Sequence, residues 1–411
     1  MAKVDKVSPL APKGGFPKLP AISGVEFATA AAGVKYSGRT DVMLATLAPE
    51  TVVAGVFTKS KTRSAPVLDC QKKLGGPSDA AAAILVNSGN SNAFTGIKGV
   101  QSVRAITEKV STTLGIPVAR VFTSSTGVIG EPLPDERITN VMADLASTTD
   151  PARIEAAANA IMTTDTYPKG TARQIDIAGK TVSIVGIAKG SGMIAPDMAT
   201  MLVYVFTDAK AEFPFLQSAL SSITETSFNC ITVDSDTSTS DTLLLAATGR
   251  SGVNVEHAGT EQFTAALREV MIDLAHQVVR DGEGATKFVT IDVSGAADNA
   301  DAYRVGKAIA DSPLVKTAIA GEDPNWGRVV MAVGKSGAAA DRDRLSIRFG
   351  ETLVAENGQV SANYIEAEAA KHMKGENITI SVDLGLGDGG ATIWTCDLTA
   401  QYIAINADYR S

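Results

Sequence analysis

The stretch KGSGMIAPDMATML, residues 189–202, constrains the fold of this chain more than any other segment. It joins two apolar runs rich in β-branched residues, TVSIVGIA before it and MLVYVFTD after it, so both flanks are predicted to be strands. The glycines and the proline between them predict a loop. Thr200 stands where this loop meets the second strand. The pattern leaves two roles open for this threonine: it caps a turn, or it carries a reaction.

The composition predicts an ordered protein that acts on small molecules. Hydrophobic residues make up 45% and charged residues 20% of the 411 residues, as in average globular proteins. This length is enough for two or three domain-sized units. The 37 basic and 45 acidic residues give a net charge of −8, without the basic excess that nucleic acid or an anionic membrane would require. We therefore expect small-molecule partners, no nucleic acid and no membrane.

The cysteines and the first residues of the chain predict a cytoplasmic protein. Cys70, Cys230 and Cys396 lie far apart, match no metal spacing, and are odd in number, which argues against a disulfide framework. The first twenty residues lack the apolar core of a signal peptide, and no apolar run is long enough to span a bilayer. We expect a reducing compartment.

The order of predicted elements indicates a mixed α/β or α+β fold. Period-two and β-rich segments predict strands at 25–33, 41–48, 51–58, 80–87, 287–295, 345–350, 377–384 and 391–405, and a strand followed by a loop at 119–130. Apolar residues recurring every three to four positions predict helices at 100–115, 135–147, 152–162, 213–228, 260–282, 301–321 and 365–375. Strands open the chain and helices follow, so we expect mixed sheets with flanking helices.

Two glycine patterns resemble a dinucleotide fingerprint without its context. Gly190, Gly192 and Ala195 satisfy G-x-G-x-x-G/A, but strand-like residues follow, whereas a pyrophosphate needs a helix N-terminus. The glycines within 385–390 also precede a strand-like run, which favours a hairpin turn. Neither pattern favours dinucleotide binding.

Other common site types find little support. The three histidines, His257, His276 and His372, lie in helical or charged stretches, and no nucleophile elbow or zinc spacing is present. The acidic stretch 233–242 lacks the glycine and distal glutamate of a calcium loop, so we interpret it as a loop that caps a strand. The segment DPNWGR, residues 323–328, is interpreted as a turn with a packing role.

A chemical argument makes Thr200 a candidate nucleophile even without a histidine. A threonine hydroxyl attacks poorly unless a base takes its proton. If the bond between Ala199 and Thr200 were cut, the new α-amino group of Thr200, with a pKa near ~7.7–8.0, could serve as that base. One residue would then supply both nucleophile and base.

Six motifs occur in order from the first third of the chain to its last residue. They are SSTG at 124–127, MTTDT at 162–166, KGSGMIAPDMATML at 189–202, DGEGATKF at 281–288, GEDPNWGR at 321–328 and the closing AINADYRS. As a set they resemble the ornithine acetyltransferase family of arginine biosynthesis, also called glutamate N-acetyltransferase. The resemblance covers essentially the whole chain.

The resemblance implies a self-processing, N-terminal-nucleophile-like acyltransferase. A single precursor would cleave itself between Ala199 and Thr200, giving an α chain of residues 1–199 and a β chain of residues 200–411. Family members assemble as α2β2 heterotetramers without a metal or another cofactor. Thr200 would act first in the cleavage and then as the nucleophile that carries the acetyl group from N2-acetylornithine to glutamate.

The resemblance also assigns roles to residues that match the family motifs. Thr126 and Gly127 correspond to the oxyanion hole. Substrate contacts correspond to Thr166, Lys189, Thr200, Glu283, Asn406 and Ser411. Many members end in threonine where this chain has Ser411, so the hydroxyl is kept and the methyl group is lost.

Two other functions stay open at this point. A hydrolase of similar self-processing architecture, with an N-terminal threonine, would pass the acyl group to water. A binding protein that keeps the fold without the chemistry would stay uncut. Family members also differ in whether acetyl-CoA serves as a second acetyl donor, and no CoA-binding signature is readable in this chain.

Overall fold

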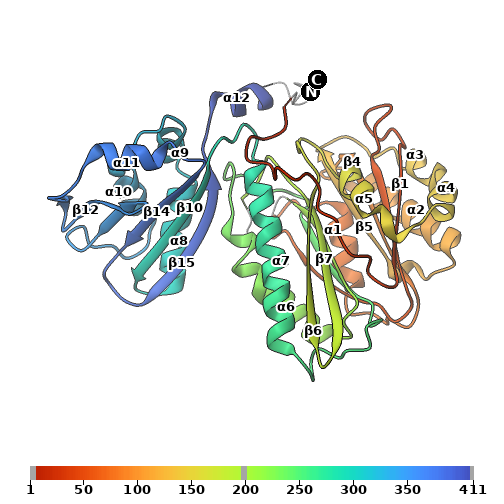
Figure 1. Ribbon diagram of the computed structural model, residues 1–411. Coiled ribbons are helices and arrows are strands. Elements are labelled where there is room, and N and C mark those ends of the chain that lie inside the picture. The colour runs from red at the N-terminus through yellow and green to blue at the C-terminus, as the bar shows by residue number, and fades with distance from the viewer. Residues whose placement is uncertain (1–5, 196–200, 408–411) are drawn as a thin grey trace. The chain divides into compact units, whose positions relative to one another are not determined.

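The computed structural model describes residues 6–195 and 201–407 (Figure 1). Three sheets, each with both parallel and antiparallel neighbours, are combined with helices, which confirms the predicted mixed α/β class. The chain forms two units. The larger contains Pro12–Asn229 and Asp236–Val278, and the smaller contains Met1–Ala11, Cys230–Ser235 and Val279–Ser411.

The larger unit contains two of the sheets. The four-stranded sheet has the order β1 (Val25–Ala30), β2 (Val42–Leu47), β4 (Ala82–Asn90), β5 (Val121–Val128). The five-stranded sheet has the order β3 (Val52–Phe57), β9 (Thr242–Ala247), β8 (Leu202–Thr207), β7 (Lys180–Lys189), β6 (Lys169–Ile177). β4 and β5 are parallel, as are β8 and β9, and the other neighbours are antiparallel.

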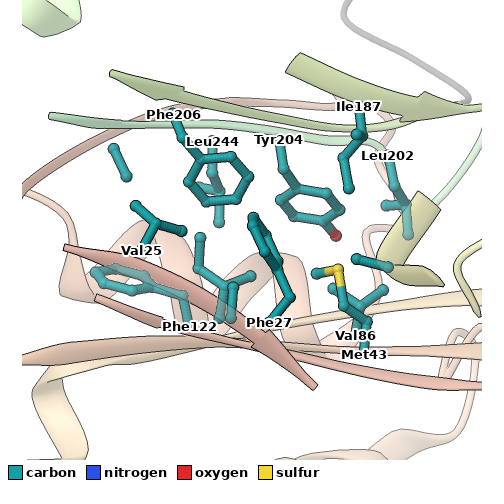
Figure 2. Packing of buried hydrophobic residues seen from close by; sticks show 14 of the residues in the cluster. Val25, Phe27, Met43, Val86, Phe122, Ile187, Leu202, Tyr204, Phe206 and Leu244 are labelled. Atoms are coloured by element: carbon teal, nitrogen blue, oxygen red, sulfur yellow. The ribbon is translucent and has the colours of Figure 1, made fainter. Parts of the chain in front are cut away.

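The core of the larger unit lies between these sheets. Side chains alternate between the faces of a strand, and both faces of β2 are buried: Met43 belongs to one apolar cluster and Leu44 to another. Figure 2 shows the cluster between the sheets, where Tyr204 and Phe206 of β8 face Phe27 of β1. The rings of Phe27 and Phe206 meet edge to face, with centroids 5.2 Å apart.

Helices cover the outer faces of the two sheets. α2 (Gly96–Leu114), α3 (Asp135–Asn140) and α4 (Met142–Ser147) pack on the four-stranded sheet, whereas α6 (Phe213–Glu225) and α7 (Thr260–Arg280) lie by the five-stranded sheet (Figure 1). Gly186 of β7 lets α7 approach, because a Cβ there would lie 2.7 Å from Leu274. α1 (Ala65–Lys73) and α5 (Ile154–Ala160) contribute to the core between the sheets.

The smaller unit has one six-stranded sheet with helices packed on it. Its order is β13 (Gln359–Val360), β12 (Thr352–Glu356), β11 (Ser346–Phe349), β14 (Asn377–Asp383), β10 (Phe288–Ala296), β15 (Gly389–Cys396). Its helices are α8 (Asn299–Ala310), α9 (Pro313–Ala320), α10 (Trp326–Gly334), α11 (Glu366–Met373) and α12 (Ala400–Asn406). α8 packs against β10 and β15 (Figure 1). No helix among the described residues is long and apolar enough to cross a membrane.

Several predicted elements are wrong in extent, and turn chemistry explains most of these errors. The strand predicted at 391–405 ends at Cys396, and α12 follows because the Thr399 side chain accepts a hydrogen bond from Gln401 N and caps a helix. The helix predicted at 301–321 is two helices, because Ser312 caps a new one that Pro313 opens.

Other predictions differ in kind. The glycines at 385–390 form no hairpin turn, since β10 lies between β14 and β15. DPNWGR is the start of α10 with Asn325 as its cap, and not an isolated turn. β6 was not predicted at all. β4 runs to Asn90, past the end of the strand predicted at 80–87, and β5 runs to Val128, into the loop predicted within 119–130.

Candidate active site

Lys189 of the KGSG motif, a predicted substrate contact, lies at one end of the five-stranded sheet beside a second lysine, Lys169. Lys169 opens β6 and Lys189 closes β7, and the antiparallel pairing of these strands brings both lysines to the same end. Lys189 pairs with Leu202, the first residue of β8. This antiparallel pairing confirms the two strands predicted on either side of the loop.

Asp165 joins these lysines in one buried cluster. Its carboxylate accepts a hydrogen bond from Lys169 Nζ at 2.7 Å, and both side chains are fully buried. It also accepts from the backbone N–H groups of Gly190 at 2.6 Å and Thr163 at 2.9 Å. The carboxylate thus ties the MTTDT motif to the KGSG motif.

The lysines keep this carboxyl ionised. Burial alone would raise the pKa of Asp165, but the ammonium groups of Lys169 and Lys189 outweigh burial and hold the pKa well below its usual range. Thr166, a predicted substrate contact, is half-buried and directly follows this anion in the chain.

Lys189 also reaches the predicted oxyanion residues. Its Nζ lies 3.3 Å from Thr126 Oγ1 near the end of β5. An ammonium group has only hydrogens to offer, so the threonine oxygen must accept this bond. The hydroxyl hydrogen of Thr126 is then directed away from Lys189, where it can be donated to another oxygen.

Gly127 occupies a place that only glycine fits. Its φ of 129° lies in the left-handed region, and a Cβ would overlap Gly89 and approach Asn90 N at 2.6 Å. Gly89 is its partner across the parallel β4–β5 pair, and the register shifts at Asn90. This bulge turns the backbone out of the regular ladder beside Thr126.

A second buried aspartate lies beside the same end of the sheet. Asp241 directly precedes β9, in the loop 233–242 that the sequence interprets as a capping loop. Burial raises the pKa of its carboxyl well above its usual range, and hydrogen bonding by the Met201 backbone and the charge of Lys189 offset only part of this effect.

The smaller unit holds two further predicted residues, and they contact one another. Asn406 Nδ2 donates to Glu283 Oε2 at 2.6 Å, and Glu283 is buried. The hydroxyl of Thr399, the cap of α12, donates to the carbonyl of Gly284 at 2.8 Å. The DGEG turn and the helix that presents Asn406 are therefore linked by one residue.

Three predicted residues, Ala199, Thr200 and Ser411, lie outside the described residues. The other predicted residues fall into two groups, Thr126, Gly127, Thr166 and Lys189 in the larger unit and Glu283 and Asn406 in the smaller. The described residues contain no group of three or more His, Cys, Asp or Glu side chains placed to hold a metal ion.

Asp165, Lys169 and Asp241 were not predicted from the sequence. Asp165 stands inside a motif that carries the family resemblance, and its position between two threonines offered a signal. Lys169 belongs to the strand that was not predicted, so its burial could not be foreseen. Asp241 was hidden among the acids and hydroxyls of a polar loop.

The family model described as "ArgJ family" matches residues 26–411. The chain belongs to the ArgJ family. An "arginine biosynthesis bifunctional protein ArgJ" from Ruegeria pomeroyi is 68% identical, and the match covers 100% of both chains. A protein of the same name from Agrobacterium fabrum is 55% identical over 98% of this chain and 99% of that one. A crystal structure of ArgJ from Bacillus halodurans is 41% identical, covers 50% of this chain and 97% of that chain, and has a TM-score of 0.48.

Membership of the ArgJ family confirms the resemblance drawn from the six motifs. It also confirms the predicted class of activity, an acyltransferase of arginine biosynthesis. These relatives favour that activity over the hydrolase alternative.

Proposed function

We propose that this ArgJ-family chain transfers the acetyl group of N2-acetylornithine to glutamate through an acetyl ester on Thr200. Thr200 Oγ attacks the acetyl carbonyl while the α-amino group of Thr200 takes the hydroxyl proton. Ornithine leaves with that proton on its amine, and the amine of glutamate then attacks the ester. Thr200 is regenerated and N-acetylglutamate is released, so the reaction is a ping-pong acyl transfer.

The same proposal requires that the chain cut itself between Ala199 and Thr200. An α chain of residues 1–199 and a β chain of residues 200–411 result, and two of each assemble as an α2β2 heterotetramer in the cytoplasm. The cut supplies the α-amino group that the mechanism uses as its base. Ordinary amines of this kind have a pKa near ~7.7–8.0 and are partly neutral at physiological pH.

The contact between Lys189 and Thr126 is the observation that carries the proposal. Because Lys189 occupies the oxygen of Thr126, the threonine hydroxyl can donate to the acetyl oxygen as it becomes negative. The backbone of Gly127, turned out of the ladder, supplies a second donor. Loss of one oxyanion donor costs roughly 3–4 kcal/mol of transition-state stabilisation in other enzymes.

The remaining candidates match the charges of the substrates. Both amino acids carry an α-carboxylate, which Lys189 could fix, and Glu283 could attract the ornithine ammonium. Asn406 donates to one oxygen of Glu283 and so ties the DGEG motif to the closing motif of the chain. Thr166 and Ser411 add hydroxyl groups that bind either substrate.

Mass spectrometry of the chains after incubation with N2-acetylornithine tests the proposal. We expect two chains on a denaturing gel, a gain of one acetyl group on the β chain without glutamate, and its loss when glutamate is added. Thr200→Ala should give one uncut, inactive chain. If Thr200→Ala is still cut at the same bond, or if acetyl is released at the same rate with and without glutamate, the proposal is wrong.

The word "bifunctional" in the names of the relatives motivates a second proposed activity. Acetyl-CoA would acylate the same Thr200 and allow glutamate to be acetylated without N2-acetylornithine. Formation of N-acetylglutamate from acetyl-CoA and glutamate alone measures it directly, and no product in that assay would restrict this chain to the transfer from N2-acetylornithine.

A further inference from the structure

Asp241 is fixed in place from both sides of its backbone. It precedes β9 as Met201 precedes β8, and the two strands are parallel with Leu202 opposite Thr242. The amide of Thr242 donates to Met201 O at 3.1 Å, and the amide of Thr58 donates to Asp241 O at 3.1 Å. The side chain of Asp241 therefore has a defined position beside Met201, the residue that follows Thr200 in the chain.

One oxygen of this carboxyl has no partner. Asp241 is only 3% exposed, and its Oδ2 makes no hydrogen bond with the part of the chain that the structure describes. A buried polar atom without a partner costs about 1–3 kcal/mol, so native proteins rarely keep one that has no use. Asp165, on the same end of the sheet, has partners for both of its oxygens.

The groups that act on Asp241 come from three neighbouring segments. The charged one is Lys189 at the end of β7, and the neutral ones are the Met201 backbone before β8 and the Thr58 side chain after β3. Lys189 also acts on Asp165 and donates to Thr126. A second cation beside Asp241 would therefore meet a carboxyl that still has one oxygen to offer.

We propose that Asp241 receives the α-amino group created when the chain is cut before Thr200 and positions it as the base for acyl transfer. This inference rests on the proposed cleavage. The Met201 backbone hydrogen-bonds the carboxyl of Asp241. Thr200 directly precedes Met201 in the chain, and consecutive Cα atoms are about 3.8 Å apart, so we expect the new amino group to come within reach of this carboxyl. Asp241 is thus a positioning residue, because it acts on the substrate through the amine.

Three proton transfers account for every proton in this scheme. In this scheme the carboxyl is protonated before the cut, because burial raises its pKa well above the usual range. After the cut that proton passes to the new amine and leaves a carboxylate beside an ammonium. The amine must lose this proton to solvent before it can act. When Thr200 Oγ then attacks, the amine takes the hydroxyl proton, and the carboxylate of Asp241 stabilises the ammonium that forms.

The test compares Asp241→Asn with Asp208→Asn. Asp208 follows the other end of β8, where its carboxylate accepts from Ser183 N at 2.9 Å, so its loss should not affect the amine. Both variants should be cut, as judged on a denaturing gel. Acetylation of the β chain by N2-acetylornithine without glutamate is then followed by mass between about pH 5 and pH 9, a range that brackets the amine.

A carboxylate beside an amine favours the protonated, positively charged form of the amine. Removing the carboxylate therefore lowers the pKa of the amine. We expect the acidic limb of acetylation in Asp241→Asn to move to lower pH by about one unit, and the plateau rate to fall roughly tenfold because the base is weaker. Asp208→Asn should match the wild type. Asp241→Glu keeps the charge and should keep the limb at the wild-type pH even if it acylates more slowly.

Two results for Asp241→Asn would overturn the proposal: a limb and rate equal to the wild type, or a folded chain that is not cut, which would assign the carboxyl to the cleavage instead. A measurement on the wild type needs no variant at all. The pKa of the Thr200 amine, read from the pH dependence of its methylation, should be about 8 or higher, whereas a buried amine without a carboxylate should fall well below ~7.7. Failure of the proposed function itself would look different, because the wild type would then stay uncut or carry acetyl on another residue.

Discussion

Asp165 and Asp241 are buried at the same end of one sheet, yet the pKa values of their carboxyl groups are shifted in opposite directions. Asp165 accepts hydrogen bonds from Lys169, Gly190 and Thr163, and its pKa is held well below the usual range. One oxygen of Asp241 has no partner among residues 6–195 and 201–407, and burial raises the pKa of this carboxyl well above that range. Burial therefore does not decide the charge of a carboxyl; the number and charge of its partners do.

The different hydrogen-bond partners of Asp165 and Asp241 indicate different roles within the site. Asp165 has partners for each oxygen and holds β6 to the KGSG motif, so it builds the site. Oδ2 of Asp241 makes no hydrogen bond with the described residues, so it can accept one from a group that forms later, such as the amine created by the cut. The charge of Lys189 lowers the pKa of both carboxyls, so a change at Lys189 should shift the pKa of both Asp165 and Asp241.

The largest expected effect is the loss of stability in Asp165→Asn. The substitution leaves Lys169 fully buried without its counterion, and breaking a buried ion pair from one side costs about 3–5 kcal/mol. Asp241→Asn should change the free energy of unfolding far less in an uncut Thr200→Ala chain. Urea unfolding followed by circular dichroism measures both variants.

The two tryptophans, Trp326 and Trp394, allow a built-in control because both belong to the smaller unit. Asp165→Asn should shift the transition seen by circular dichroism more than the one seen by tryptophan fluorescence. The matched variant Asp397→Asn removes a buried carboxylate that accepts from Thr286 N and Lys287 N, and it should shift the fluorescence transition. Equal stability of Asp165→Asn and Asp241→Asn would remove the contrast between the two aspartates.

Replacing the lysine that acts on both carboxyls should have the next largest effect. Lys189→Met should lower kcat/KM for N2-acetylornithine by about 10²–10³, because the Thr126 hydroxyl is no longer oriented toward the oxyanion and the α-carboxylate of the substrate loses its cation. Lys287→Met is the control, since Lys287 is also buried but pairs with Glu322 at 2.8 Å in the smaller unit. If both variants lose activity equally, Lys189 has no special place in the site.

Replacing Thr126, the residue that Lys189 contacts, should have a smaller effect on kcat. Thr126→Ala should lower kcat by roughly 10²-fold, the lower end of the range for one oxyanion donor, and change KM little, because the hydroxyl acts on the developing oxyanion. Thr126→Ser keeps the oxygen that Lys189 contacts and should recover most of the rate. A raised KM with unchanged kcat would instead place Thr126 in substrate binding.

Much of the fold was predictable from sequence because the elements carry strong local patterns. The longest helix, α7, and the strands β7 and β8 follow from periodicity and β-branched runs. α12 was not predictable from the sequence, because β-branched and aromatic residues continue past Cys396. Only the cap at Thr399 shows where the strand ends and the helix begins. β6 was not either, because its polar positions show no clear alternation and its partner β7 supplies the pairing.

The candidate site was predictable only in part, for a related reason. Motifs identify residues that stand near one another in sequence, such as Thr126 and Gly127. The pairing of Lys169 with Asp165 also lies within four residues, but its burial depends on strand pairing that only the structure describes. That one oxygen of Asp241 has no partner among the described residues follows from the three-dimensional packing, which no local sequence pattern records.

The smallest expected effect is on the pH dependence of stability. The pKa shifts of the two aspartates predict slopes of opposite sign for the free energy of unfolding against pH. The unfolded pKa of an aspartate is about 3.9. The folded pKa of Asp165 lies below this value, so its contribution is fully present above about pH 4 and is lost as the pH falls towards the folded pKa. The folded pKa of Asp241 lies above the unfolded value, so the folded state binds more protons, and stability falls as the pH rises from about 4 through the folded pKa. Each unit of pKa difference is worth about 1.4 kcal/mol.

In an uncut Thr200→Ala chain, the gap in Tm between that chain and its Asp165→Asn derivative should therefore narrow on acidification. The Asp241→Asn derivative should gain stability relative to the same chain as the pH rises from about 4 to 7. Parallel curves for the two derivatives would mean that both carboxyls carry the same charge in the folded protein, and the distinction between them would then have to be abandoned.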